Sequence, residues 1–210
     1  MKNTETINAK AKKEYVSDSF KNPEKNNGRY ERMKRDLIDN ILESCVKLGF
    51  ADTPITFYYP ETSLTELFGC GKDELTSAIS EFRKNEQDHF GDISFEELND
   101  EKRRYAVKIP AEGTEWVHAH FEPSDFIKEF VKEIKKPGIT LNDIADFFRR
   151  FSPTVDIKKI SLDEWALSFT DENIDPYVYH IEQNEFGLEY HRFTKEAYRN
   201  LMENDNPEHK

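Results

Sequence analysis

Two short amphipathic segments joined by a glycine turn constrain the fold of this chain more than any other feature. The turn is Gly69-Cys70-Gly71, and the segment before it opens with the box Ser63-Leu-Thr-Glu66. A serine followed three residues later by a glutamate is typical of a helix N-terminus, because each side chain caps a backbone amide of the other. The segment after the turn repeats apolar side chains on one helical face, at Leu75, Ala78, Ile79 and Phe82. This pattern predicts a helix-turn-helix.

The segments on either side extend this pattern to a larger unit. Apolar residues recur every three or four positions from Tyr30 to Leu48, and Gly49 follows as a stop signal, which predicts a long amphipathic helix. A short strand is expected at Ile55–Tyr59, and a β-hairpin from the runs 93–98 and 104–109. Helix, strand, two short helices and hairpin is the order of a winged helix-turn-helix, which we predict over residues 29–110.

The second half of the chain predicts a different unit. Residues 111–136 are expected to form a connecting segment and a helix with Pro123 in its first turn, ended by Lys135-Lys136-Pro137-Gly138. After this break, Thr140 caps a helix, four strand-like runs follow, and Thr194 caps a last helix. We therefore predict an α+β protein in which residues 137–210 form a small α+β domain with an antiparallel meander, while residues 1–28 form a mobile tail.

Charge and composition limit the classes of function. The formal net charge is −12 and charged residues make up 34% of the chain, while 16 Phe, 9 Tyr and 2 Trp supply core material. Such an acidic chain repels phosphate backbones, so non-specific binding to nucleic acid or to an anionic membrane is not expected. The sequence has no signal-peptide pattern and no long apolar run. A cytoplasmic protein with two reduced cysteines, Cys45 and Cys70, is expected.

One stretch carries a resemblance to a known family. The segment from Leu48 to Gly69, LGFADTPITFYYPETSLTELFG, resembles a domain-of-unknown-function family of Gram-positive bacteria. The resemblance implies a bacterial protein and provides no catalytic residue.

A DNA-binding regulator is one candidate function. Base contacts would come from Ser77, Ser80 and Lys84 of the second short helix, and phosphate contacts from the wing residues Lys102, Arg103 and Arg104. However, residues 29–110 contain 12 basic and 17 acidic residues. DNA readers usually concentrate positive charge on the reading face, so a winged helix used for packing or for protein contact is favoured.

A metal site is another candidate. If Trp116–Glu122 is a strand, His118, His120 and Glu122 point to one face and can hold a divalent ion; if it is a helix, only His118 and Glu122 align. Periodicity over so few residues leaves both alternatives open. Separately, a hairpin turn at Glu185-Phe186 places His180 opposite His191, a pair that can bind metal or respond to pH.

No signature of a nucleophilic, nucleotide-binding or dinucleotide-binding enzyme occurs in the sequence. The aromatic runs Phe57-Tyr58-Tyr59 and Phe147-Phe148 fit a core, with partner binding as the alternative. We therefore predict a non-enzymatic protein-interaction or regulatory module without a cofactor. Its partner is expected to be a protein, either a basic one or another copy of this chain. A DNA-binding regulator is the second interpretation, and a metal-dependent enzyme using His118 and His120 is the third.

Overall fold

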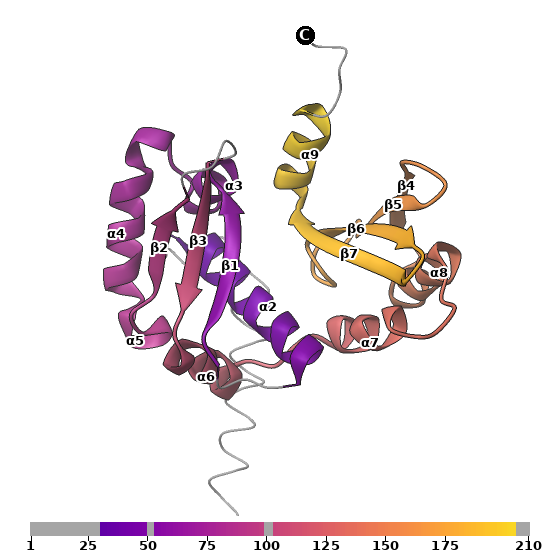
Figure 1. Cartoon of the computed structure of the whole chain (residues 1–210), viewed down its shortest axis with the longest axis horizontal. Coiled ribbons are helices and arrows are strands. Elements are labelled where there is room, and N and C mark those ends of the chain that lie inside the picture. The colour runs from indigo at the N-terminus through magenta and orange to yellow at the C-terminus, as the bar shows by residue number, and fades with distance from the viewer. Residues whose placement is uncertain (1–29, 50–52, 99–102, 205–210) are drawn as a thin grey trace, which may run out of the picture. The chain divides into compact units, whose positions relative to one another are not determined.

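The computed structural model describes residues 30–49, 53–98 and 103–204 (Figure 1). The chain divides into two compact units, Met1–Pro123 and Ser124–Lys210. Each combines helices with an antiparallel sheet, so the α+β class is confirmed. The predicted tail lies outside the described residues, as does Lys102. No helix of the described ranges is both long enough and apolar enough to cross a membrane.

The first unit alternates helices with the strands of one small sheet. Its elements are α2 (Glu31–Leu48), β1 (Ile55–Pro60), α3 (Glu61–Phe68), η1 (Lys72–Glu74), α4 (Leu75–Asn85), α5 (Gln87–Phe90), β2 (Ser94–Glu97), β3 (Arg104–Ile109) and α6 (Ala111–His120). The sheet has the order β1-β3-β2, and all pairs are antiparallel. The predicted long helix, first strand, glycine turn and hairpin all form.

The core of the first unit lies between the helices and the sheet. The predicted apolar stripe of α2 is buried from Met33 to Leu42, whereas Leu48 at its end is exposed, and Gly49 ends the helix with a φ of 78°. In the sheet, Val107 pairs with both Phe57 and Phe95. Rings from different elements meet edge to face in this core, with Phe68 and Phe82 at 5.5 Å between centroids. A buried carboxylate also joins α2 to β1, since the Tyr59 hydroxyl donates to Asp36 at 2.6 Å.

Two expectations for the first unit are wrong in detail. Ser63 is not a helix N-cap, because α3 already begins at Glu61, directly after Pro60 ends β1. The strand alternative for Trp116–Glu122 is also wrong, because Pro110 ends β3 and opens α6, which runs through this segment to His120.

The second unit is a four-stranded meander with helices on both faces. After α7 (Asp125–Ile134) and α8 (Leu141–Phe151) come β4 (Val155–Lys159), β5 (Glu164–Phe169), β6 (Tyr177–Asn184), β7 (Gly187–Thr194) and α9 (Lys195–Asn204). The sheet order β4-β5-β6-β7 confirms the predicted antiparallel meander. The capping box between Thr140 and Asp143 forms as expected. The hydroxyl of Thr194 also caps α9, by accepting from the Ala197 amide at 3.1 Å.

Helix α7 belongs to this second unit. The ring centroid of Phe126 lies 5.1 Å from that of Phe148 on α8 and 4.8 Å from that of Phe169 on β5. The ring centroid of Phe130 lies 4.8 Å from that of Tyr179 on β6. The division therefore falls at Pro123, and not at the Pro137-Gly138 break that the sequence favours. The helix begins at Asp125, two residues after Pro123, with Ser124 as its N-cap.

Candidate functional site

The residues expected to read DNA are exposed in the first unit. Ser77, Ser80 and Lys84 lie on α4, and Arg103 and Arg104 lie at the start of β3, with their side chains exposed as well. The position of Lys102 is not described.

Several cations of this unit are paired with its own carboxylates. Glu61 at the start of α3 lies 3.1 Å from Lys72 and 3.9 Å from Arg103. Arg83 on α4 lies 3.1 Å from Asp92, and Lys34 of α2 lies 2.8 Å from Glu86. Four cations of this unit, among them Arg103 of the predicted wing, therefore have acidic partners, which reduces their attraction for phosphates.

The three residues of the first metal hypothesis do not share a face. In α6, positions two residues apart point to opposite sides of the helix, so His118 and His120 diverge. The His120 ring stacks on Trp116 at 4.9 Å, and its Nδ1 lies 2.8 Å from the Trp116 carbonyl oxygen. Glu122 follows the end of the helix and is exposed. The hypothesis depends on side chains alternating between the two faces of a strand, and this segment is not a strand.

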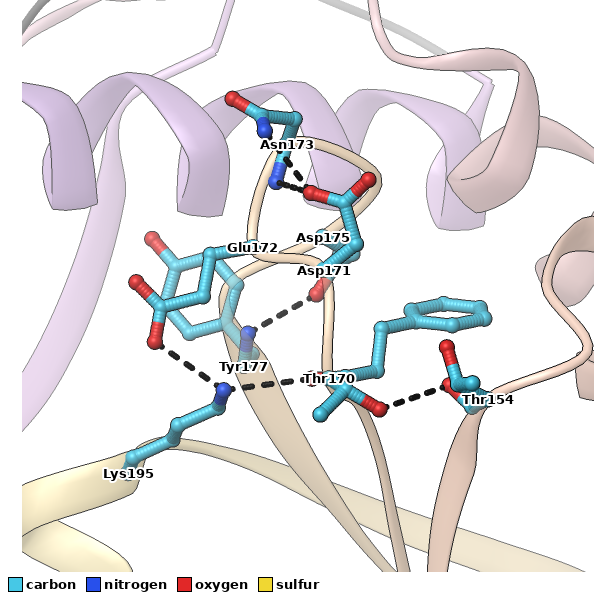
Figure 2. A network of polar contacts seen from close by, with 9 residues as sticks. Thr154, Thr170, Asp171, Glu172, Asn173, Asp175, Tyr177 and Lys195 are labelled. Atoms are coloured by element: carbon cyan, nitrogen blue, oxygen red, sulfur yellow. Dashed lines mark hydrogen bonds and ion pairs between the residues drawn. The ribbon is translucent and has the colours of Figure 1, made fainter.

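The loop between β5 and β6 is held by its own polar side chains (Figure 2). Lys195, the first residue of α9, donates to the Phe169 carbonyl at 3.1 Å and to Glu172 at 3.0 Å. The buried Asp175 accepts from the Tyr177 amide at 3.0 Å and from the Tyr179 hydroxyl at 3.0 Å. Lys195 thus connects α9 to the loop and to the end of β5, and Asp175 connects the loop to β6. We therefore interpret the network as structural.

A cluster of one histidine and two glutamates lies on the face of the second sheet that α9 covers. The Nε2 atom of His180 lies 2.9 Å from Oε1 of Glu164 and 3.4 Å from Oε1 of Glu182. His180 is only 8% exposed, and its ring lies 5.9 Å from that of Tyr198 on α9. Burial and the charge of Glu164 together raise the pKa of the Tyr198 hydroxyl. Among the described residues, these three form the one group of at least three His, Cys, Asp or Glu side chains whose possible ligand atoms all lie within 4.8 Å of one another.

One of the three residues of this cluster, His180, is identified from the sequence. His180 does pair with His191 across β6 and β7, as the turn at Glu185-Phe186 predicts. However, His191 is exposed, and His180 approaches the glutamates instead. The two-residue spacing of His180 and Glu182 on one strand indicates that their side chains share a face. The third member, Glu164 on β5, is not predictable in this way, because a long loop separates β5 from β6.

Comparison with known proteins identifies a family. Residues 30–202 match the family described as "Domain of unknown function, E. rectale Gene description (DUF3877)", and the chain belongs to this family. The comparison with curated proteins finds no match. The comparison with solved structures likewise finds none.

Proposed function

We propose that the protein is a non-enzymatic regulatory module that binds another protein through two turns of its second sheet. The observation that carries this proposal is the exposure of two large apolar side chains, Leu162 at 93% and Phe186 at 88%. Leu162 lies between β4 and β5, and Phe186 lies between β6 and β7. In an antiparallel meander these two turns lie at the same end of the sheet, about two strand spacings or roughly 10 Å apart.

Backbone hydrogen bonding supports a common surface for the two turns. The Gln183 amide, near the end of β6, donates to the carbonyl oxygen of Asp163 at 2.7 Å. The end of β6 is thus connected to the turn that carries Leu162. Large apolar groups held in water at fixed positions are typical of interaction sites, and aromatic side chains are enriched at the centres of such sites.

The charges beside these side chains indicate the chemistry of the partner. Asp163 follows Leu162 and Glu185 precedes Phe186, and both acids are exposed. A protein surface with an apolar pocket and a basic rim would complement this pattern, since opposite charges at the rim favour encounter and correct orientation. We therefore propose a partner protein with such a pocket, and a second copy of this chain as the alternative occupant.

Substitution of the two apolar side chains tests this proposal. Phe186→Ser and Leu162→Ser are compared with Tyr58→Ser, which removes a 62% exposed aromatic side chain from β1 of the first unit. A photo-crosslinking residue at position 186 identifies the partner in the bacterial host, and the complex is then reconstituted from purified proteins. We expect at least tenfold weaker binding for Phe186→Ser, and wild-type binding for Tyr58→Ser. Equal affinities for all variants would contradict the proposal, and concentration-dependent dimers lost in Phe186→Ser would identify a second copy as the occupant.

For the first unit we propose a winged helix-turn-helix. The element order and the sheet order β1-β3-β2 support this assignment, because the hairpin follows the two short helices and pairs with the strand between the first two helices. The exposure of Ser77, Ser80 and Lys84 on α4 favours DNA binding as a second candidate function. The paired cations around Glu61 weigh against it.

Binding to labelled DNA duplexes distinguishes a winged helix that packs or contacts protein from one that binds DNA. Fluorescence anisotropy of the full chain at physiological salt should give dissociation constants no tighter than about 10⁻⁵ M, which is within the range of non-specific binding. Glu61→Gln, which leaves Lys72 and Arg103 without their carboxylate, should strengthen this binding. If the wild-type chain instead binds a host sequence with nanomolar affinity, and Lys84→Ala abolishes that affinity, a DNA-binding regulator replaces the present proposal.

A further inference from the structure

The cluster around His180 is built by the register of the second sheet. His180 and Glu182 are two residues apart on β6, so their side chains lie on the same face. Glu164 on β5 pairs directly with Glu182, which brings a second carboxylate to that face. The three ligand atoms therefore all come from two paired strands.

Like charges directly opposite each other on neighbouring strands destabilise a sheet. Glu164 is half-buried, so water screens its repulsion with Glu182 only in part. One imidazole carries at most a single positive charge, which leaves one negative charge of the two carboxylates uncompensated. A divalent cation balances both.

Two polar atoms beside the cluster also lack partners. His180 Nδ1 and the Tyr198 hydroxyl oxygen are buried and have no hydrogen-bond partner among the residues that the structure describes. Tyr198 itself is only 8% exposed. Buried groups of this kind indicate a water molecule or an ion beside them. A water ligand of an ion bound at Nε2 can bond to the Tyr198 hydroxyl, whereas Nδ1 points away from such an ion on the other side of the imidazole ring.

The separations fit a metal shell. Metal–ligand bonds of about 2.0–2.2 Å in a tetrahedral shell place neighbouring ligand atoms roughly 3.3–3.5 Å apart. The separations of His180 Nε2 from the two glutamate oxygens are 2.9 and 3.4 Å. A shift of a few tenths of an ångström in the Glu164 side chain brings its separation from His180 into this range, and the two glutamate oxygens lie within 4.8 Å of each other.

We propose that Glu164, His180 and Glu182 bind a divalent transition-metal ion, with Zn²⁺ as the ion of choice. One imidazole nitrogen with two carboxylate oxygens suits Zn²⁺, whereas Ca²⁺ and Mg²⁺ prefer shells made of oxygen alone. Three protein ligands leave a position for water on the side of Tyr198. The ion would join β5 to β6 beneath α9, independently of whether the turns of this sheet bind a partner.

Calorimetric titration of the full chain tests this site. The purified protein is treated with a chelator, dialysed and titrated with Zn²⁺, with Mg²⁺ as the comparison ion. We expect one equivalent of Zn²⁺ to bind, no saturable binding of Mg²⁺, and a higher unfolding temperature for the zinc-bound protein. Glu164→Gln and Glu182→Gln should each weaken zinc binding at least tenfold.

The matched control is His191→Ala, which removes an exposed histidine opposite His180 and should leave the zinc affinity within twofold. The ¹⁵N resonances of the His180 imidazole should shift on zinc addition, which reports ligation directly. Absence of saturable zinc binding, or wild-type affinity in both glutamine variants, would show that the carboxylates only pair with His180. Because the glutamine variants change charge with little change of shape, they keep the test decisive even if a substitution of the buried His180 unfolds the protein.

Discussion

Gly113 in α6 lies where no side chain fits. A Cβ atom at this position would lie 2.7 Å from the carbonyl oxygen of Phe90 and 2.8 Å from Cγ2 of Ile109. Backbone cannot move aside as a flexible side chain can, so Gly113→Ala should force α6 away from α5 and β3. We expect a loss of about 1–3 kcal/mol in the free energy of unfolding, measured by urea denaturation.

Gly71→Ala is the matched control at the same scale. Its Cβ would have one neighbour, a carboxylate oxygen of Glu74 at 3.9 Å, and its φ is −75°. A change of no more than about 0.5 kcal/mol is expected for such a site. Equal stabilities of the two variants would contradict the close contact at Gly113.

Single residues are predictable from sequence where periodicity alone decides their burial. The apolar face of α7 is buried as its spacing predicts, and so is that of α2 from Met33 to Leu42, although Leu48 is exposed. Partners of polar side chains are not predictable in this way. Ser63 has the sequence of an N-cap, yet Pro60 starts the helix earlier, because proline ends the strand and its extended backbone suits the N-cap position.

At the scale of elements, Glu133 connects α7 to α8. Its carboxylate lies 2.8 Å from Lys136 and 3.3 Å from Arg150, and these partners hold its pKa below the ordinary value of 4.5, with the hydrogen bond from Lys136 as the largest cause. A lowered pKa in the folded state stabilises the protein above the ordinary pKa. The contribution is lost as the pH falls through the lower folded value.

Glu133→Gln should therefore destabilise the protein at pH 7 by about 0.5 kcal/mol, since the pairs are near the surface. The difference from wild type should disappear when the pH falls well below 4.5. Urea denaturation at a series of pH values measures both, with Glu129→Gln on the exposed side of α7 as the control. A difference that persists unchanged at low pH would exclude the ionised carboxylate as its cause.

Strand pairing is predictable only where a short turn sets it. The tight turn at Glu185-Phe186 places His180 opposite His191, and the structure has this register. Between β5 and β6 the connection runs from Thr170 to Pro176, and its conformation depends on contacts such as Lys195 with Glu172 (Figure 2). The pairing of Glu164 with Glu182, and with it the candidate metal site, therefore depends on contacts distant in sequence.

At the scale of the whole molecule, the division into two units depends on the aromatic core of the second one. The Pro137-Gly138 sequence has the composition of a linker, but the connection there is a turn between α7 and α8. Composition identifies a break in secondary structure and does not show which helices share a core. The rings of Phe126 and Phe130, which contact α8 and the sheet, decide that α7 belongs to the second unit.

Two fragments test this boundary. Residues 124–210 contain the whole ring cluster and should fold alone, with a stability of about 5–10 kcal/mol that is ordinary for a domain of this size. Residues 138–210 lack Phe126 and Phe130, and loss of a buried phenylalanine costs about 3–5 kcal/mol each. The shorter fragment should therefore have no stable fold. Cooperative urea unfolding, followed by circular dichroism, is expected for the longer fragment alone, and cooperative unfolding of the shorter one would return the boundary to Pro137-Gly138.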